Sequence, residues 1–211
     1  MTTARADVAF QFDDPLQQRE AATLGMWIFL AAELIFFGGA FVCYGASAYS
    51  HGPEFARAAN RTNLPLGAVN TAVLLTSSWT MALAVHAARE GRRRPLLGFL
   101  LGTAALGAVF VALKGTEYVE DYHQHLVPGR DFQGSAEARL FFSFYFVMTG
   151  IHALHLVIGI ALLSALAGIA WRSRGTLQTF NSFENSGLYW HFVDVVRIFL
   201  FPLLYLRGRH L

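Results

Sequence analysis

Residues 187–206 read GLYWHFVDVVRIFLFPLLYL and have the length of one membrane-spanning helix, because about twenty residues at ~1.5 Å each cross a bilayer core. The stretch nevertheless contains three ionisable residues, His191, Asp194 and Arg197. Their spacing of three places them on one face of a helix. A charge that faces lipid at mid-bilayer costs about 2.5–3.5 kcal/mol, so other helices must cover this face. The same spacing allows Asp194 and Arg197 to form an ion pair.

The composition of the chain is that of an integral membrane protein. Hydrophobic residues make up 55% of its 211 residues and charged residues only 14%, which is unusual for a soluble domain. A formal net charge of +2 gives no reason to expect a nucleic-acid partner. Residues 1–22 are polar and lack the apolar core of a signal peptide. We therefore expect a polar N-terminal segment followed by a single transmembrane domain over residues 23–211.

Five apolar stretches are long enough to cross a membrane. They lie at about residues 24–44, 66–88, 96–119, 140–170 and 187–206. The sequence therefore predicts an all-α fold, a polytopic membrane helix bundle with five transmembrane helices. Arg89 and the cluster Arg92–Arg94 lie between the second and third stretches, and loops rich in arginine face the cytoplasm. This predicts a cytoplasmic N-terminus, with the C-terminus on the other side of the membrane.

Carboxylates and imidazoles lie within or near the predicted spans: Glu33, Glu117, His152, His155, His191 and Asp194. Metal sites in helix bundles commonly use Glu-x-x-His pairs, and no two of these carboxylates and histidines form a Glu-x-x-His sequence. We therefore expect no metal site, no haem ligand and no catalytic residue on this chain, and histidines that bond across helices. Glu33 has two open interpretations, a neutral acid with one hydrogen bond and a group linked to protons or lipid. Lys114 and Glu117 are predicted to form a local ion pair near the outer interface.

Several of these residues belong to segments that resemble one family, subunit III of the haem-copper respiratory oxidases. The segments are Gly25-Met26-Trp27 through Glu33 to Phe37, Glu117-Tyr118, Thr149–His155 (TGIHALH) and Tyr189–Asp194 (YWHFVD). They lie on four spans in the family's order, and the resemblance covers roughly Thr23 to Leu206. The chain is similar to the short, five-helix form of the family. Within that form, Phe141–Gly159 and Phe201–Leu206 are similar to a branch associated with nitric oxide reductase.

The resemblance implies a non-catalytic subunit III of a haem-copper terminal oxidase in a prokaryotic inner (plasma) membrane. Such a subunit assembles with catalytic subunit I and with subunit II, binds phospholipid and carries no cofactor, because haem and copper lie in the partner. Electron transfer from cytochrome c or quinol to oxygen is then the partner's reaction. In the family, the glutamate matching Glu33 is associated with lipid and with sustained proton uptake. The resemblance assigns His152, His155, His191 and Asp194 to an internal polar network, and we expect Glu117 and Arg197 to belong to the same network.

Arg197 departs from the family pattern, which usually has tryptophan at this position. An arginine there needs a partner, and the candidates are Asp194 one turn earlier, a lipid phosphate or a partner subunit. We predict that Arg197→Trp is tolerated. Two other functions stay open at this stage: an accessory membrane subunit of a nitric oxide reductase, and a stand-alone membrane transporter or enzyme that uses the carboxylates and histidines.

Overall fold

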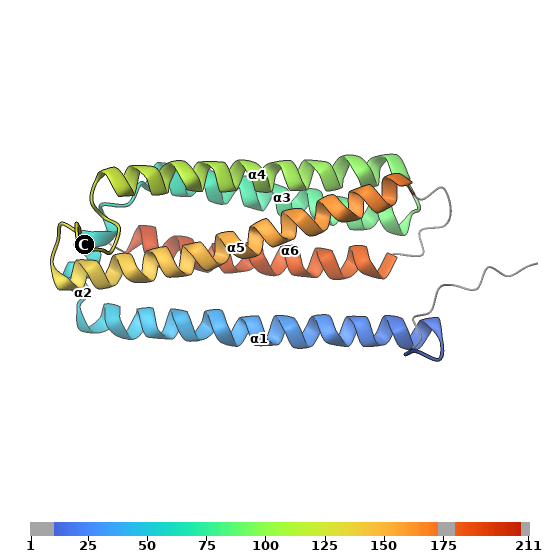
Figure 1. Cartoon of the computed structure of the whole chain (residues 1–211), viewed down its shortest axis with the longest axis horizontal. Helices are drawn as coiled ribbons and strands as arrows, with labels where there is room; N and C mark the ends of the chain where they lie inside the picture. Colours follow the sequence, from blue (N-terminus) through green and yellow to red (C-terminus); the bar gives the residue numbers. More distant parts are fainter. Residues whose placement is uncertain (1–10, 173–179, 208–211) are drawn as a thin grey trace, which may run out of the picture.

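The computed structural model describes residues 11–172 and 180–207, and the regular elements in this part of the chain are all helical (Figure 1). In chain order they are α1 (Pro15–Ser50), α2 (Gly52–Ala59), α3 (Leu64–Arg89), α4 (Arg93–His123), α5 (Ala136–Arg172), α6 (Phe180–Phe201) and a π-helical turn, η1 (Pro202–Leu206). Among the described residues, five segments are long and apolar enough to cross a membrane: α1, α3, α4, α5, and α6 with η1. The predicted all-α bundle with five transmembrane helices is confirmed, and its orientation stays a prediction.

The long helices extend beyond the apolar stretches of the sequence. The first helix begins at Pro15, inside the segment expected to be polar, because Asp14 caps it. The Asp14 carboxylate accepts a hydrogen bond from the backbone N–H of Gln17 at 2.7 Å, and proline fits the first helical turn. Asn63 caps α3 in the same way, accepting from the N–H of Leu66 at 3.2 Å. These caps are polar, so apolar length alone does not locate the helix ends.

The short helix α2 was not predicted. It lies between the first two spans, and its Phe55 side chain is completely buried. The Phe55 ring lies 5.7 Å from the Tyr44 ring of α1 and 5.6 Å from the Phe141 ring of α5, measured between centroids. Aromatic pairs at these separations stabilise packing beyond the apolar area they bury. Through Phe55, α2 therefore joins α1 to α5 at one end of the bundle.

Helices α3, α4, α5 and α6 form the body of the bundle, and α1 lies along its outside against α5 and α6 (Figure 1). Only Phe37, Tyr44 and Ala48 of α1 are buried. At one end the Tyr44 hydroxyl donates to the carbonyl of Leu203 at 2.7 Å, and at the other the Asn185 amide donates to the carbonyl of Ala22 at 3.4 Å. Polar contacts therefore hold α1 at both ends, while most of its length is exposed.

Trp190 of α6 packs into the body of the bundle between two glycines. A Cβ atom on Gly107 of α4 would lie 2.8 Å from Trp190 Cη2, and one on Gly159 of α5 would lie 2.9 Å from Trp190 Cζ3. The indole Nε1 donates to the Ser77 hydroxyl of α3 at 3.1 Å. Small residues let helices approach closely in membrane proteins, and here they admit the large ring. This contact positions α6, the helix that carries His191, Asp194 and Arg197.

Candidate functional site

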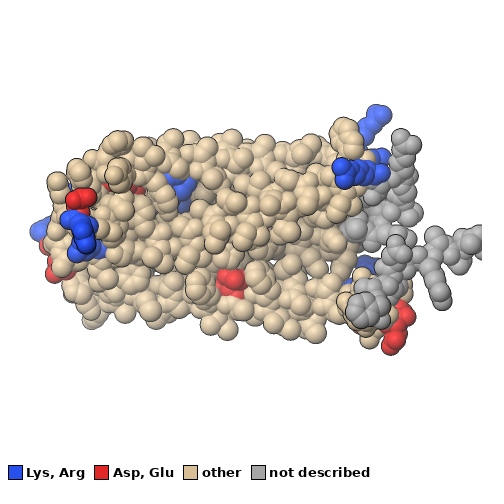
Figure 2. Space-filling model, viewed as in Figure 1, with Lys and Arg blue, Asp and Glu red and all other residues tan. Residues whose placement is uncertain are grey.

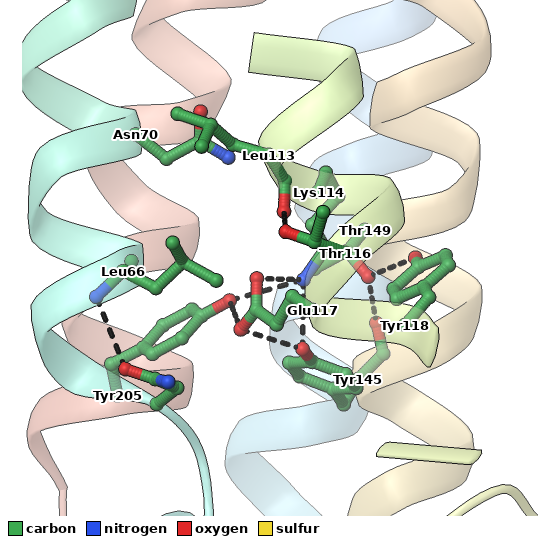
Figure 3. Close-up of polar contacts among 12 residues, drawn as sticks. Leu66, Asn70, Leu113, Lys114, Thr116, Glu117, Tyr118, Tyr145, Thr149 and Tyr205 are labelled. Atoms are coloured by element: carbon green, nitrogen blue, oxygen red, sulfur yellow. Dashed lines mark hydrogen bonds and ion pairs between the residues drawn. The ribbon is translucent and has the colours of Figure 1, made fainter. Parts of the chain in front are cut away.

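A closed network of four polar side chains lies inside the bundle (Figure 3). Lys114 Nζ of α4 donates to Glu117 Oε2 at 2.9 Å, to the Tyr145 hydroxyl of α5 at 2.8 Å and to the Tyr205 hydroxyl of η1 at 3.1 Å. Both tyrosine hydroxyls donate in turn to Glu117 Oε1, at 2.9 Å for Tyr145 and 2.7 Å for Tyr205. The predicted Lys114–Glu117 ion pair is therefore formed, as part of a larger network from three elements.

This network satisfies a buried charge pair. The side chains of Lys114 and Glu117 are 3% and 1% exposed. A buried ion pair is stable only where further hydrogen bonds satisfy the remaining donors and acceptors, and the two tyrosines supply them. The ammonium group also lies 4.3 Å from the ring centroid of Tyr145 and 4.8 Å from that of Tyr118, within cation–π range. The four side chains therefore hold one another in place.

Arg197 lies close to this network and does not pair with Asp194. Its Nε donates to the Thr71 hydroxyl and its Nη2 to the carbonyl of Gly67, both on α3 and both at 3.2 Å. The guanidinium carbon lies 5.5 Å from the ring centroid of Tyr205 and 5.3 Å from that of Phe110. The ion pair expected from the i, i+3 spacing is not formed within the described residues, because the long arginine side chain reaches across to α3 instead.

Asp194 and His191 lie on the same helix and both face Ser78 of α3. His191 Nδ1 is 2.7 Å from the Ser78 hydroxyl oxygen, a hydrogen bond between helices as predicted for the histidines. Asp194 is 3% exposed, and in the described part of the chain neither of its carboxylate oxygens has a hydrogen-bond partner. The Ser78 hydroxyl lies beside that carboxylate, outside normal hydrogen-bond geometry. A buried carboxylate with no donor is unusual and calls for an explanation.

Glu33 contacts His155 at the seam between α1 and α5. Glu33 Oε2 lies 3.3 Å from His155 Nε2, and the side chains are 19% and 14% exposed respectively. His155 Nδ1 is 2.9 Å from the carbonyl oxygen of Ile151, and the Phe37 ring packs edge-on against the imidazole at 5.6 Å. Figure 2 shows acidic atoms at the surface midway along the molecule, where most of the surrounding surface is uncharged. The structure therefore leaves this carboxylate and imidazole partly accessible at the seam.

His152 is the remaining histidine of the predicted set. It is 1% exposed, packs edge-on against the Phe110 ring at 5.6 Å, and neither ring nitrogen has a hydrogen-bond partner among the described residues. Within residues 11–172 and 180–207, no three histidine, cysteine, aspartate or glutamate side chains are arranged to hold a metal ion. The candidate residues therefore fall into separate groups: Glu117 with Lys114, Arg197 with α3, His191 and Asp194 with Ser78, Glu33 with His155, and His152 alone.

Sequence reasoning missed the partners of these residues. Tyr145, Tyr205, Ser78 and Thr71 are ordinary polar residues of membrane helices, and they lie far along the chain from the groups they contact. One signal was available for Tyr145, which lies seven residues before His152 on the same helix. That spacing is two turns, so the two residues lie on the same buried face of α5.

Comparison with known proteins identifies the family. A model of the cytochrome c oxidase subunit III family matches residues 6–209. The chain belongs to this family. Its relatives include the quinol oxidase subunit 3 of Bacillus subtilis (strain 168), which is 36% identical over 187 residues, 88% of this chain and 86% of the relative. The cytochrome c oxidase subunit 3 of Latimeria chalumnae is 34% identical over 205 residues, 94% of this chain and 74% of the relative.

A third relative, the cytochrome c oxidase subunit 3 of Alkalihalophilus pseudofirmus, is 33% identical over 190 residues, 88% of this chain and 86% of the relative. Membership of the cytochrome c oxidase subunit III family confirms the resemblance found in the sequence. The chain is therefore a subunit III of the haem-copper oxidase type, a multi-pass membrane protein that belongs to a complex with other subunits.

Proposed function

We propose that this chain is a non-catalytic subunit III that binds phospholipid along α1, sustains proton uptake and stabilises catalytic subunit I of a haem-copper terminal oxidase. The observation that carries the proposal is the contact between Glu33 and His155 at the α1–α5 seam. A carboxylate and an imidazole 3.3 Å apart can share a proton, and both are partly exposed within the apolar part of the bundle. Ionisable residues at such depth commonly mark proton or substrate paths.

The surface of α1 supports the lipid part of the proposal. Most of this helix is exposed, and its exposed large apolar residues include Leu24, Trp27, Ile28, Phe29, Leu34, Ile35, Phe36 and Val42. Aliphatic and aromatic side chains in such density bind acyl chains or apolar surfaces of other subunits. Figure 2 shows charged atoms mostly at the two ends of the molecule, with a broad and mostly uncharged band between them. An acyl chain lying on α1 would pass beside Glu33 and shield its contact with His155.

The partners follow from the same evidence. We propose assembly with catalytic subunit I and subunit II in a prokaryotic plasma membrane, which is consistent with bacterial relatives named quinol oxidase subunit 3 and cytochrome c oxidase subunit 3. Haem and copper would be bound by the partner, which would carry out the reduction of oxygen. We propose that this chain itself binds no metal, which is compatible with the absence of a group of three possible metal ligands from residues 11–172 and 180–207.

Replacing Glu33 tests the proposed role in the purified complex. We expect Glu33→Ala to leave assembly and the initial rate of oxygen consumption nearly unchanged, and to shorten the time for which turnover continues. Glu33→Gln keeps the size of the side chain and should have the same effect, because the amide cannot exchange a proton as a carboxylate does. Glu20→Ala is the matched control, since Glu20 lies on the same helix and is exposed near its start.

An unchanged active lifetime in both Glu33 variants would contradict the proposal. The purified complex should contain haem, copper and bound phospholipid phosphorus. Its phospholipid content should fall when exposed apolar residues of α1 such as Ile35 are replaced by glutamate. Haem with non-haem iron and turnover of nitric oxide would instead identify a nitric oxide reductase complex.

A further inference from the structure

A surface cavity of about 450 Å³ opens beside His191, between α1, α3 and α6. Its polar lining includes Thr23, His86, Arg89, Glu184 and Asn185. Arg89 and Glu184 form an ion pair across the cavity wall at 2.5 Å. A cavity lined by charged and amide groups at the end of a membrane bundle is a place where water has several hydrogen-bond partners. The cavity lies at the end of the bundle that the arginine pattern predicts to face the cytoplasm.

A short polar path leads from this cavity into the bundle. His191 lines the cavity, and its Nδ1 is 2.7 Å from the Ser78 hydroxyl. Beyond Ser78 lies the carboxyl group of Asp194, which is 3% exposed. An imidazole has a second nitrogen, so His191 can contact water in the cavity through Nε2 while Nδ1 stays on Ser78. The three side chains thus connect the aqueous end of the bundle to a buried acid.

The surroundings of Asp194 do not stabilise a negative charge. On its own helix the nearest cation is Arg197, whose guanidinium is directed to Gly67 and Thr71. On α3 the neutral hydroxyl of Ser78 lies beside it, and the ionisable His86 and Arg89 of that helix line the cavity. On α4 the ammonium of Lys114 is paired with Glu117, and on α5 the buried imidazole of His152 has no hydrogen-bond partner among the described residues. An isolated carboxylate buried in this way is so costly that the group takes up a proton instead.

We propose that Asp194 is a proton-binding site, and that it exchanges its proton with water in the cavity through Ser78 and His191. A proton arrives at His191 Nε2, and the proton on Nδ1 passes to the Ser78 oxygen. The Ser78 side chain then turns toward Asp194 and donates its own proton to the carboxylate. Rotation of the hydroxyl and a change of imidazole tautomer restore the starting arrangement, so no other reactant is needed. Ser78 lies between the histidine and the aspartate, whereas a hydrolytic triad requires the histidine between the other two.

The path ends at Asp194 and does not cross the membrane. One turn further along α6 lies the fixed cation Arg197, which would repel a proton moving deeper into the bundle. The site is therefore a store that fills and empties from one side. This inference does not rest on the proposed role of Glu33, and its test requires no turnover of the complex.

Infrared spectroscopy of the purified complex tests the proposal directly, because a protonated carboxyl has a carbonyl absorption that an ionised one lacks. We expect a band that shifts in D₂O and that Asp194→Asn abolishes. Ser78→Ala should keep the band and slow its shift in D₂O by about 100-fold, the lower end of what a positioned proton-transfer group contributes. Thr76→Ala is the matched control, because it removes an exposed hydroxyl of α3 that bonds only to its own helix at Ala72.

Two results would overturn the proposal. A spectrum that Asp194→Asn leaves unchanged would mean that Asp194 is ionised, and equal exchange in Ser78→Ala and Thr76→Ala would mean that the proton does not pass through Ser78. If Asp194→Asn fails to assemble, Asp194→Glu is the alternative variant, because it keeps an acid at this position. The carbonyl band should then shift in frequency, and an unshifted band would refute its assignment to Asp194. Ser78→Thr keeps the hydroxyl and should exchange as fast as the natural chain.

Discussion

Replacing Lys114 by methionine tests whether the buried network of α4, α5 and η1 stabilises the bundle. Methionine is unbranched and flexible, so it fills nearly the same space without the charge. Glu117 would then lose its counter-ion while its side chain stays 1% exposed. Removal of one member of a buried ion pair costs about 3–5 kcal/mol, because the other charge remains buried. We therefore expect Lys114→Met to lower the free energy of unfolding by about that amount.

A double variant separates the ion pair from simple packing. Glu117→Gln keeps Oε1 as an acceptor for the hydroxyls of Tyr145 and Tyr205, which donate to it at 2.9 and 2.7 Å in the natural chain. In Lys114→Met/Glu117→Gln no buried charge is left without a partner at this place. The loss of stability in the double variant should therefore be smaller than the sum of the two single losses by about 2–3 kcal/mol, as for strongly coupled neighbours.

The measurement is the unfolding of the chain as SDS replaces a mild detergent in mixed micelles, followed by tryptophan fluorescence. Arg57→Met is the control, because it breaks an ion pair at the surface. The side chain of Arg57 is 76% exposed and that of its partner Glu54 is 37% exposed. An exposed pair contributes at most about 1 kcal/mol. A loss in Lys114→Met no larger than that of the control, or strictly additive losses in the double variant, would refute the reasoning.

Two further predictions concern α5 and α6. Arg197→Trp should still assemble, because a large ring can fill the buried space between α3 and the aromatic side chains that Arg197 now occupies; complete loss of the chain from the purified complex would contradict this. Gly159→Ala should destabilise the bundle by about 1–3 kcal/mol in the micelle assay, since its Cβ would meet the rigid Trp190 ring at 2.9 Å. Gly168→Ala is the control on the same helix, because a Cβ atom there would have no neighbouring residue within 4 Å, and it should be neutral or slightly stabilising. Equal effects of the two substitutions would count against close packing at Trp190.

The sequence predicted the class, the number of spans and the family because each rests on local information. Apolar length reports a span, and short segments such as Thr149–His155 carry the resemblance. The i, i+3 spacing also predicted the Lys114–Glu117 pair correctly, and Lys114 Nζ donates to Glu117 Oε2 at 2.9 Å. The same rule did not hold for Asp194 and Arg197. Arginine is long enough to find acceptors on α3, so the neighbouring helix decided its contact.

The sequence by itself determined that this protein is a five-helix membrane bundle of the cytochrome c oxidase subunit III family, since hydrophobic length and family segments are properties of the chain. Only the tertiary structure decided which polar groups meet. Lys114 and Tyr205 are ninety-one positions apart and Ser78 and His191 one hundred and thirteen, so no spacing rule connects them. Their contacts depend on how α6 approaches α3 and α4, and that approach is set by the packing of Trp190 against Gly107 and Gly159.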